Sequence, residues 1–136
     1  MRLVLVCGAS ILAFAATAVA ANHIRATMST SSTKPVAGTP WRYTIVVKDQ
    51  NGRPAVTKAR LQILLGTVVV GCLKRTAMVP CQGAKAGTWI SFKGKRKGVV
   101  RWPAQSVGVK LTFQAIVVAG GRTVRLRVPV TVLPVP

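Results

Sequence analysis

The chain has 136 residues, of which 20 are Lys or Arg and one is acidic, so its formal net charge is +19. Half of the residues are hydrophobic, which excludes a disordered polycation and suits one globular domain. The only carboxylate side chain is Asp49 and the only histidine is His23, so paired-carboxylate and most other acid–base catalysis is excluded. We therefore expect a protein that is not an enzyme and has no cofactor, metal site or small-molecule substrate.

Residues 1–21 predict a signal peptide. Arg2 gives a positive start, an almost wholly apolar run follows, and small residues precede two cleavage sites, after Ala20 and after Ala21. We expect export and a mature domain of residues 22–136. The alternative is an uncleaved amino-terminal membrane anchor, because the apolar run approaches the length that spans a bilayer. After cleavage His23 would lie close to the new terminus, where a copper site is the alternative to a frayed end.

Alternation of apolar and polar residues predicts β-strands along the mature chain. A first strand is expected near residues 24–28. In residues 41–49 the odd positions are mostly apolar, and residues 50–54 then supply turn-forming Asn, Gly and Pro. We expect Asp49 to hydrogen-bond the backbone of this turn. Residues 59–65 alternate again and form the next strand.

Cys72 and Cys81 are the cysteines of the mature chain, and they predict a disulfide. Exported proteins meet oxidising conditions, and the spacing is not that of a C-x-x-C metal or redox pair. Closing a loop of this length is worth about 2.5–3 kcal/mol on the chain-entropy model.

The second half of the chain predicts four more strands. Two weaker strands, residues 88–93 and 99–102, flank a basic loop at residues 94–98. Residues 109–117 and 124–132 form a hairpin around two glycines. Pro129 places the last strand at a sheet edge, because proline cannot donate to a ladder.

About seven short strands and no helical period predict an all-β fold, a two-sheet antiparallel sandwich in one domain. The aromatic residues Trp41, Tyr43 and Phe113 fall on inward faces and are expected in its core. Trp102 fits either the core or the rim.

One strand and turn resemble those of bacterial immunoglobulin-like domains of secreted and surface proteins. The motif reads Trp41-x-Tyr43-x-Ile45-x-Val47-x-Asp49-x-x-Gly52-x-Pro54. The resemblance, which extends to domains of the fibronectin type III kind, implies an immunoglobulin-like sandwich and a binding, spacer or surface module with no catalytic residue. The antibody-type bridge between sheets is missing, because Cys72 and Cys81 are too close in sequence.

The charge predicts an anionic partner, such as an acidic envelope polymer, or another polyanion. In an immunoglobulin-like arrangement the third strand and the last two share a sheet, and their outward cations form one face. These candidate residues are Lys58, Arg60, Lys110, Arg125 and Arg127, with the neutral Gln62, Thr112, Gln114 and Thr123 between them. The rival candidates are the basic loop residues Lys93, Lys95, Arg96 and Lys97.

Two other interpretations of the charge stay open. The basic residues could simply be solvated outer faces of strands that discourage edge pairing. Alternatively, the protein could be a secreted cationic effector that acts on membranes or nucleic acid. Charges that alternate with apolar residues in strands, and not on an amphipathic helix, favour the binding module.

Overall fold

The computed structural model describes residues 14–19 and 24–136, which contain ten β-strands, one short 3-10 turn and no α-helix. The strands are β1 (Phe14–Val19), β2 (Ile24–Thr30), β3 (Pro40–Asp49), β4 (Val56–Leu65), β5 (Val68–Lys74), β6 (Ala77–Pro80), β7 (Trp89–Lys93), β8 (Lys95–Arg101), β9 (Lys110–Ala119) and β10 (Arg122–Thr131). The 3-10 turn η1 spans Ala104–Ser106. The prediction of an all-β chain is confirmed.

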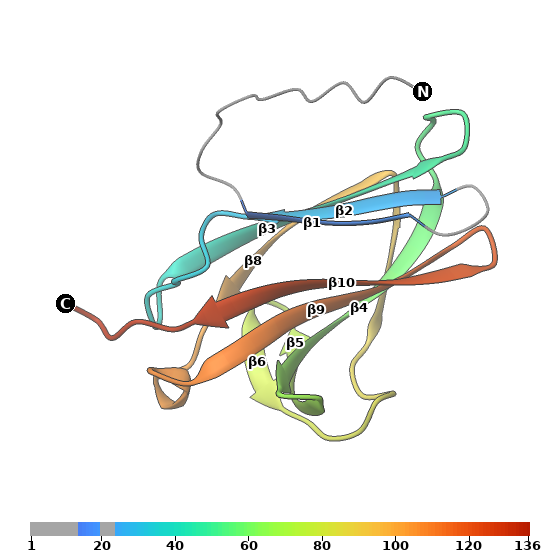
Figure 1. The fold of residues 1–136 in the computed structure, drawn as a ribbon. Coiled ribbons are helices and arrows are strands. Elements are labelled where there is room, and N and C mark those ends of the chain that lie inside the picture. The colour runs from blue at the N-terminus through green and yellow to red at the C-terminus, as the bar shows by residue number, and fades with distance from the viewer. Residues whose placement is uncertain (1–13, 20–23) are drawn as a thin grey trace.

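The strands belong to one continuous sheet in the order β1-β2-β3-β8-β6-β5-β4-β9-β10, and β7 pairs with β4 beside this path. The sheet curls until β1 and β2 lie against β10, which nearly closes a barrel (Figure 1). The sequence predicted two separate sheets of about seven strands. The β5–β6 hairpin makes the difference, because it continues the sheet from β4 to β8. Gly71 and a register shift after Ile63 interrupt the alternation by which that hairpin could have been recognised.

The predicted alternation sets which side chains form the core. Along β3, Trp41, Tyr43, Ile45 and Val47 are buried, while Arg42 between them is exposed. The same alternation runs through β10, whose only strand partner among the described residues is β9, so Pro129 does lie on an edge strand.

Two walls enclose this core, one made of β2, β3 and β8 and the other of β4, β9 and β10. Trp41 and Tyr43 of β3 meet Phe113 of β9 with ring centroids 5.1 and 5.4 Å apart. Trp102 is 1% exposed and its ring lies 5.3 Å from that of Trp41, so it belongs to the core and not to the rim. Since the inner faces pack together, the outer faces of the two walls point in opposite directions.

The turn after β3 and the disulfide both follow the sequence predictions. Asp49 Oδ1 accepts hydrogen bonds from the backbone N–H groups of Asn51 and Arg53, at 2.8 and 3.0 Å. Cys72 and Cys81 are bonded, with their Cα atoms 5.8 Å apart. These features are decided by residues close together in the chain.

Strand β1 lies inside the segment for which the sequence predicts a signal peptide. It pairs antiparallel with β2, from Phe14 opposite Thr30 to Val19 opposite Arg25. The expected cleavage sites after Ala20 and Ala21, and His23, lie outside the described residues. Among residues 14–19 and 24–136, no helix is long and apolar enough to cross a membrane.

The predicted basic loop at residues 94–98 is not a loop. β7 pairs with β4 and β8 pairs with β3, so a single kink at Gly94 carries an extended chain from one wall to the other. Gly94 has φ +75° and lies directly against the ring of Pro54. Its N–H donates to Ala55 O and its carbonyl accepts from Val47 N, which fixes the kink between the walls.

We predict that Gly94→Ala destabilises the fold by more than Gly108→Ala. Both glycines have nearly the same positive φ, +75° and +77°, but only Gly94 has a side chain, that of Pro54, where a Cβ would go. Both variants place an alanine in the left-handed region, which lowers the free energy of unfolding. In Gly94→Ala the added Cβ also overpacks against Pro54, which should lower it by about 1–3 kcal/mol more. Urea unfolding measures both free energies, and equal losses would contradict this account of the kink.

Candidate anion-binding surface

The register places β4, β9 and β10 side by side, as the sequence predicted for its third and last two strands. Residues directly opposite one another in an antiparallel ladder project to the same side. Arg125 therefore projects outward in a row with Ile116, Arg60 and Trp89. Because neighbouring strands are about 4.8 Å apart, the Cα atoms of Arg125 and Arg60 lie about 10 Å apart.

Trp89 of β7 is the aromatic centre of this outer face. Its ring lies 4.2 Å from the guanidinium carbon of Arg60 and 4.7 Å from Nζ of Lys58. Such cation–π contacts are worth about 0.5–1 kcal/mol at exposed sites. Arg60 Nε is buried without a hydrogen-bond partner among the described residues, and the guanidinium lies over the Trp89 ring. The indole thus holds both cations in place on the surface.

A hollow of about 530 Å³ lies on the same face, between β4, β7 and the end of β9. Lys58 and Lys93 line it together with Ser91, which stands directly opposite Lys58. Two ammonium groups and a hydroxyl can together bind phosphate, sulfate or carboxylate oxygens. Sequence analysis missed this hollow because it grouped Lys93 with the cations of the basic loop and not with Lys58.

We call the group Lys58, Arg60, Lys93, Arg125 and Arg127 the β4–β9–β10 surface. Lys110, the remaining candidate of the sequence analysis, is exposed at the other end of β9, opposite Thr131. Lys110 is six positions from Ile116, or about 20 Å along the strand, so Lys110 is remote from the hollow.

The neutral residues expected among these charges are partly hidden. Gln62 and Gln114 are 0% and 4% exposed, although the sequence predicted that both would be outward and available. Gln62 Nε2 donates to the carbonyls of Ala84 and Ala86, at 3.0 and 2.8 Å, so the segment 82–88 after the disulfide lies over β4. We call this segment the covering loop.

A relay of side chains connects the covering loop to the edge strand. Arg127 Nε donates to Gln114 Oε1 at 2.7 Å, and Gln114 Nε2 donates to Gln62 Oε1 at 3.1 Å. Leu64, Val69 and Cys72 form a small second core beneath the loop. The open part of the face is therefore the end that carries Lys58, Arg60 and Arg125.

The basic loop candidates separate into three environments. Lys93 joins the β4–β9–β10 surface, while Lys95 and Lys97 stand opposite Val46 and Thr44 on the outside of the other wall. Arg96 stands opposite the buried Ile45 and is half-buried. Burial raises the pKa of the Tyr43 hydroxyl, an effect that a hydrogen bond from Arg96 and its positive charge partly oppose.

The other wall also carries a row of exposed cations, which the sequence analysis did not group. Arg25 and Lys48 are direct partners on β2 and β3, and Arg42 lies farther along β3. We call the outer residues Arg25, Arg42, Lys48, Lys95 and Lys97 the β2–β3–β8 surface. Strand alternation could have identified it, but assigning Lys95 and Lys97 to a loop separated them from their neighbours.

The two surfaces differ in more than position. The β4–β9–β10 surface combines its cations with an aromatic ring and a hollow. The one acidic side chain, Asp49, is occupied by its own turn. Within the described residues, no group of three or more His, Cys, Asp or Glu could hold a metal ion. Neither a scan against protein-family models nor a search of curated proteins finds a match to the chain.

We predict that Gln114→Leu destabilises the protein by about 1–3 kcal/mol, because it leaves the buried Gln62 Oε1 without its donor. Thr112→Leu, two residues earlier on the same face of β9, is the control because no hydrogen bond of the relay involves it. Urea unfolding should show a lower midpoint for Gln114→Leu only. A midpoint equal to that of the control would mean that the relay contributes nothing to stability.

Proposed function

We propose that this chain is an exported, non-enzymatic binding module that holds an anionic polymer on its β4–β9–β10 surface. The hollow lined by Lys58, Lys93 and Ser91 is the observation that carries the proposal. It lies beside Arg60 and Arg125 on a face without a carboxylate side chain. Repeated cations across neighbouring strands suit a partner with repeated charges.

A polymer explains the surface better than solubility alone does. A surface kept soluble by charge usually mixes both signs, whereas this chain has 20 basic residues and one acidic residue. Trp89 is half-buried among the cations, where its ring stacks with Arg60 and leaves the guanidinium edge for anionic oxygens. Acidic polysaccharides and polymers with phosphate repeats have such oxygens.

We also propose that the module is immunoglobulin-like and acts in the bacterial cell envelope. The strand and Asp49 turn that carry the resemblance adopt the expected conformation, and the last two strands form the expected hairpin. Two walls packed through aromatic side chains are compatible with a sandwich, although the sheet continues between them. The signal-peptide features and the disulfide support export.

The salt dependence of polymer binding tests the assigned surface. We predict that changing Lys58, Lys93 and Arg125 to Gln weakens binding to poly(glycerol phosphate) and flattens the plot of log affinity against log salt concentration. Losing three phosphate contacts should reduce the slope by about 2, at about 0.7 per contact for flexible polyanions. Fluorescence anisotropy of labelled polymer at several salt concentrations measures both quantities.

The matched control changes Arg42, Lys95 and Lys97 to Gln on the β2–β3–β8 surface. Both triple variants remove two Lys and one Arg, and all six residues are exposed, so the net charge falls equally. The control should keep the slope of the unaltered protein. Equal losses of affinity and slope in the two variants would mean that net charge alone drives binding. Equal binding to polymer, duplex DNA and anionic vesicles would favour the cationic effector instead.

Export makes a prediction about β2. If the signal peptide is removed, β1 leaves with it, and the β2 amides that pair with β1 lose their partners. We predict that amino-terminal sequencing of exported protein begins at Ala21 or Asn22. Alternate amides of β2 should then exchange hydrogen faster than those bonded to β3. A sequence that begins at Met1 would contradict cleavage and leave the membrane-anchored alternative.

A further inference from the structure

A cavity of about 360 Å³ opens at the end of the barrel away from the basic hollow. Lys58 lines the hollow and Leu65 lines the cavity, and they are seven positions apart along β4, which corresponds to about 23 Å. The cavity is therefore separate from the proposed anion-binding surface, and the inference drawn from it does not rest on the proposed function.

The cavity exists because two neighbouring strands barely overlap. β6 and β8 share one residue pair, Ala77 opposite Arg101, and Arg101 N donates to Thr76 O beside it. β8 ends at Arg101, while β6 runs on to Pro80 in the same direction. From that point no strand of residues 14–19 or 24–136 pairs with β6 on that side, and the segment with Trp102 and η1 crosses the gap instead.

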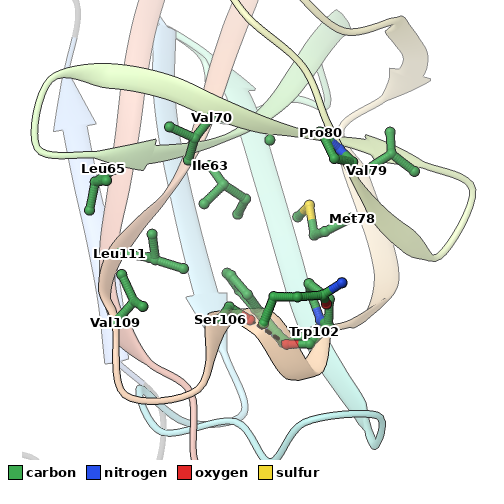
Figure 2. A pocket seen from close by; sticks show the side chains of 13 residues that line it. Ile63, Leu65, Val70, Met78, Val79, Pro80, Trp102, Ser106, Val109 and Leu111 are labelled. Atoms are coloured by element: carbon green, nitrogen blue, oxygen red, sulfur yellow. Dashed lines mark hydrogen bonds between the residues drawn. The ribbon is translucent and has the colours of Figure 1, made fainter.

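The side chains around the gap are almost all apolar. Figure 2 shows Ile63, Val70, Met78 and Leu111 around a common hollow, with Val109 and Ser106 along one side. Leu65 and Val70 are 49% and 36% exposed, so apolar surface continues from the cavity to the outside of the β4–β5 hairpin. Ligand pockets in proteins have volumes from about 300 Å³ upward and are mostly apolar with a few polar groups. The cavity meets this description.

One residue of the cavity wall, Trp102, carries an unpaired polar group. It lines the cavity, is 1% exposed, and its Nε1 has no hydrogen-bond partner among the described residues. The other core indole differs, since Trp41 Nε1 donates to Ser32 O at 2.8 Å. The Ser106 hydroxyl is already used, because it donates to Pro103 O at 2.6 Å. Buried indole N–H groups usually have a hydrogen-bond partner, and the described residues supply none for Trp102 Nε1.

We propose that this cavity binds the acyl chain of an amphiphile, with an ester, carbonyl or hydroxyl oxygen of that molecule accepting a hydrogen bond from Trp102 Nε1. The apolar side chains of the cavity would contact the acyl chain, and Trp102 Nε1 would donate to the nearest oxygen of the ligand. Gln105, which is exposed at the cavity, adds an amide for the polar end.

The test uses the fluorescent fatty acid cis-parinarate as probe and the neutral alcohol dodecanol as competitor. We expect saturable binding of one probe per chain, displacement by dodecanol, and little change with salt, because the chain and not the charge is recognised. Absence of saturable binding, or failure of dodecanol to compete, would overturn the proposal.

Three variants locate the site. Val109→Trp should fill the cavity and abolish binding, whereas Val56→Trp, the same change at a residue 77% exposed and outside the cavity, should leave affinity unchanged. Trp102→Phe keeps an aromatic ring but removes the donor, and should weaken binding about two- to tenfold, the effect of one neutral hydrogen bond. Each variant is compared at a temperature where its thermal unfolding curve shows it folded.

The outcomes separate the parts of the proposal. Binding retained by Val109→Trp, or lost equally by Val56→Trp, would place the probe elsewhere and overturn the site. Unchanged affinity of Trp102→Phe would overturn the hydrogen bond. Transfer of parinaroyl lipid from neutral phosphatidylcholine vesicles would identify a membrane lipid as the source of the chain, and binding of the free acid alone would identify a free amphiphile. Val109→Trp should still bind poly(glycerol phosphate), which keeps this test independent of the anion-binding surface.

Discussion

Phe113 of β9 packs between the two walls, and its ring lies 5.1 Å from Trp41, 5.4 Å from Tyr43 and 6.3 Å from Trp102. These separations are typical of interacting aromatic pairs, and all four side chains are at most 2% exposed. The contacts join β3, β9 and the segment after β8, so they fix how the walls face each other. Because strand side chains alternate, holding these rings inside forces the basic residues between them to the outside. The charged surfaces are thus a consequence of the core.

The charge alone does not distinguish one outer surface from the other. Both walls carry exposed cations, and a long-range field would attract polyanions to either. What differs is local. On the β4–β9–β10 surface Trp89 orders Lys58 and Arg60, and a hollow brings Lys58 to the same space as Lys93. The covering loop hides the other half of β4 and limits the open area to that end. A specific contact needs this ordering, since loose surface charges contribute little individually.

The barrel is least regular where β6 passes the end of β8, and the apolar cavity lies at this gap. Trp102 connects it to the core. Its ring belongs to the aromatic cluster around Phe113, and its buried indole N–H has no hydrogen-bond partner among the described residues. The core and the proposed acyl-chain site therefore share one side chain. The basic hollow and the cavity lie at opposite ends of β4, so an anionic group and an apolar chain would be held at separate places.

Alternation determined most of the strands by itself, because the side-chain period of two is read directly from neighbouring residues. The Asp49 turn and the Cys72–Cys81 bridge were also predictable, since each joins residues less than a dozen apart. Only the tertiary structure decided which outward residues remain exposed. Gln62 has the alternation of a surface residue, but the covering loop, more than twenty positions away, buries it. The run of cations from Lys93 to Lys97 reads as one loop in the sequence. The kink at Gly94 divides it between two walls, because the strands that pair on either side of it come from distant parts of the chain. The cavity depends in the same way on where β6 and β8 end relative to each other, and no local pattern records that offset.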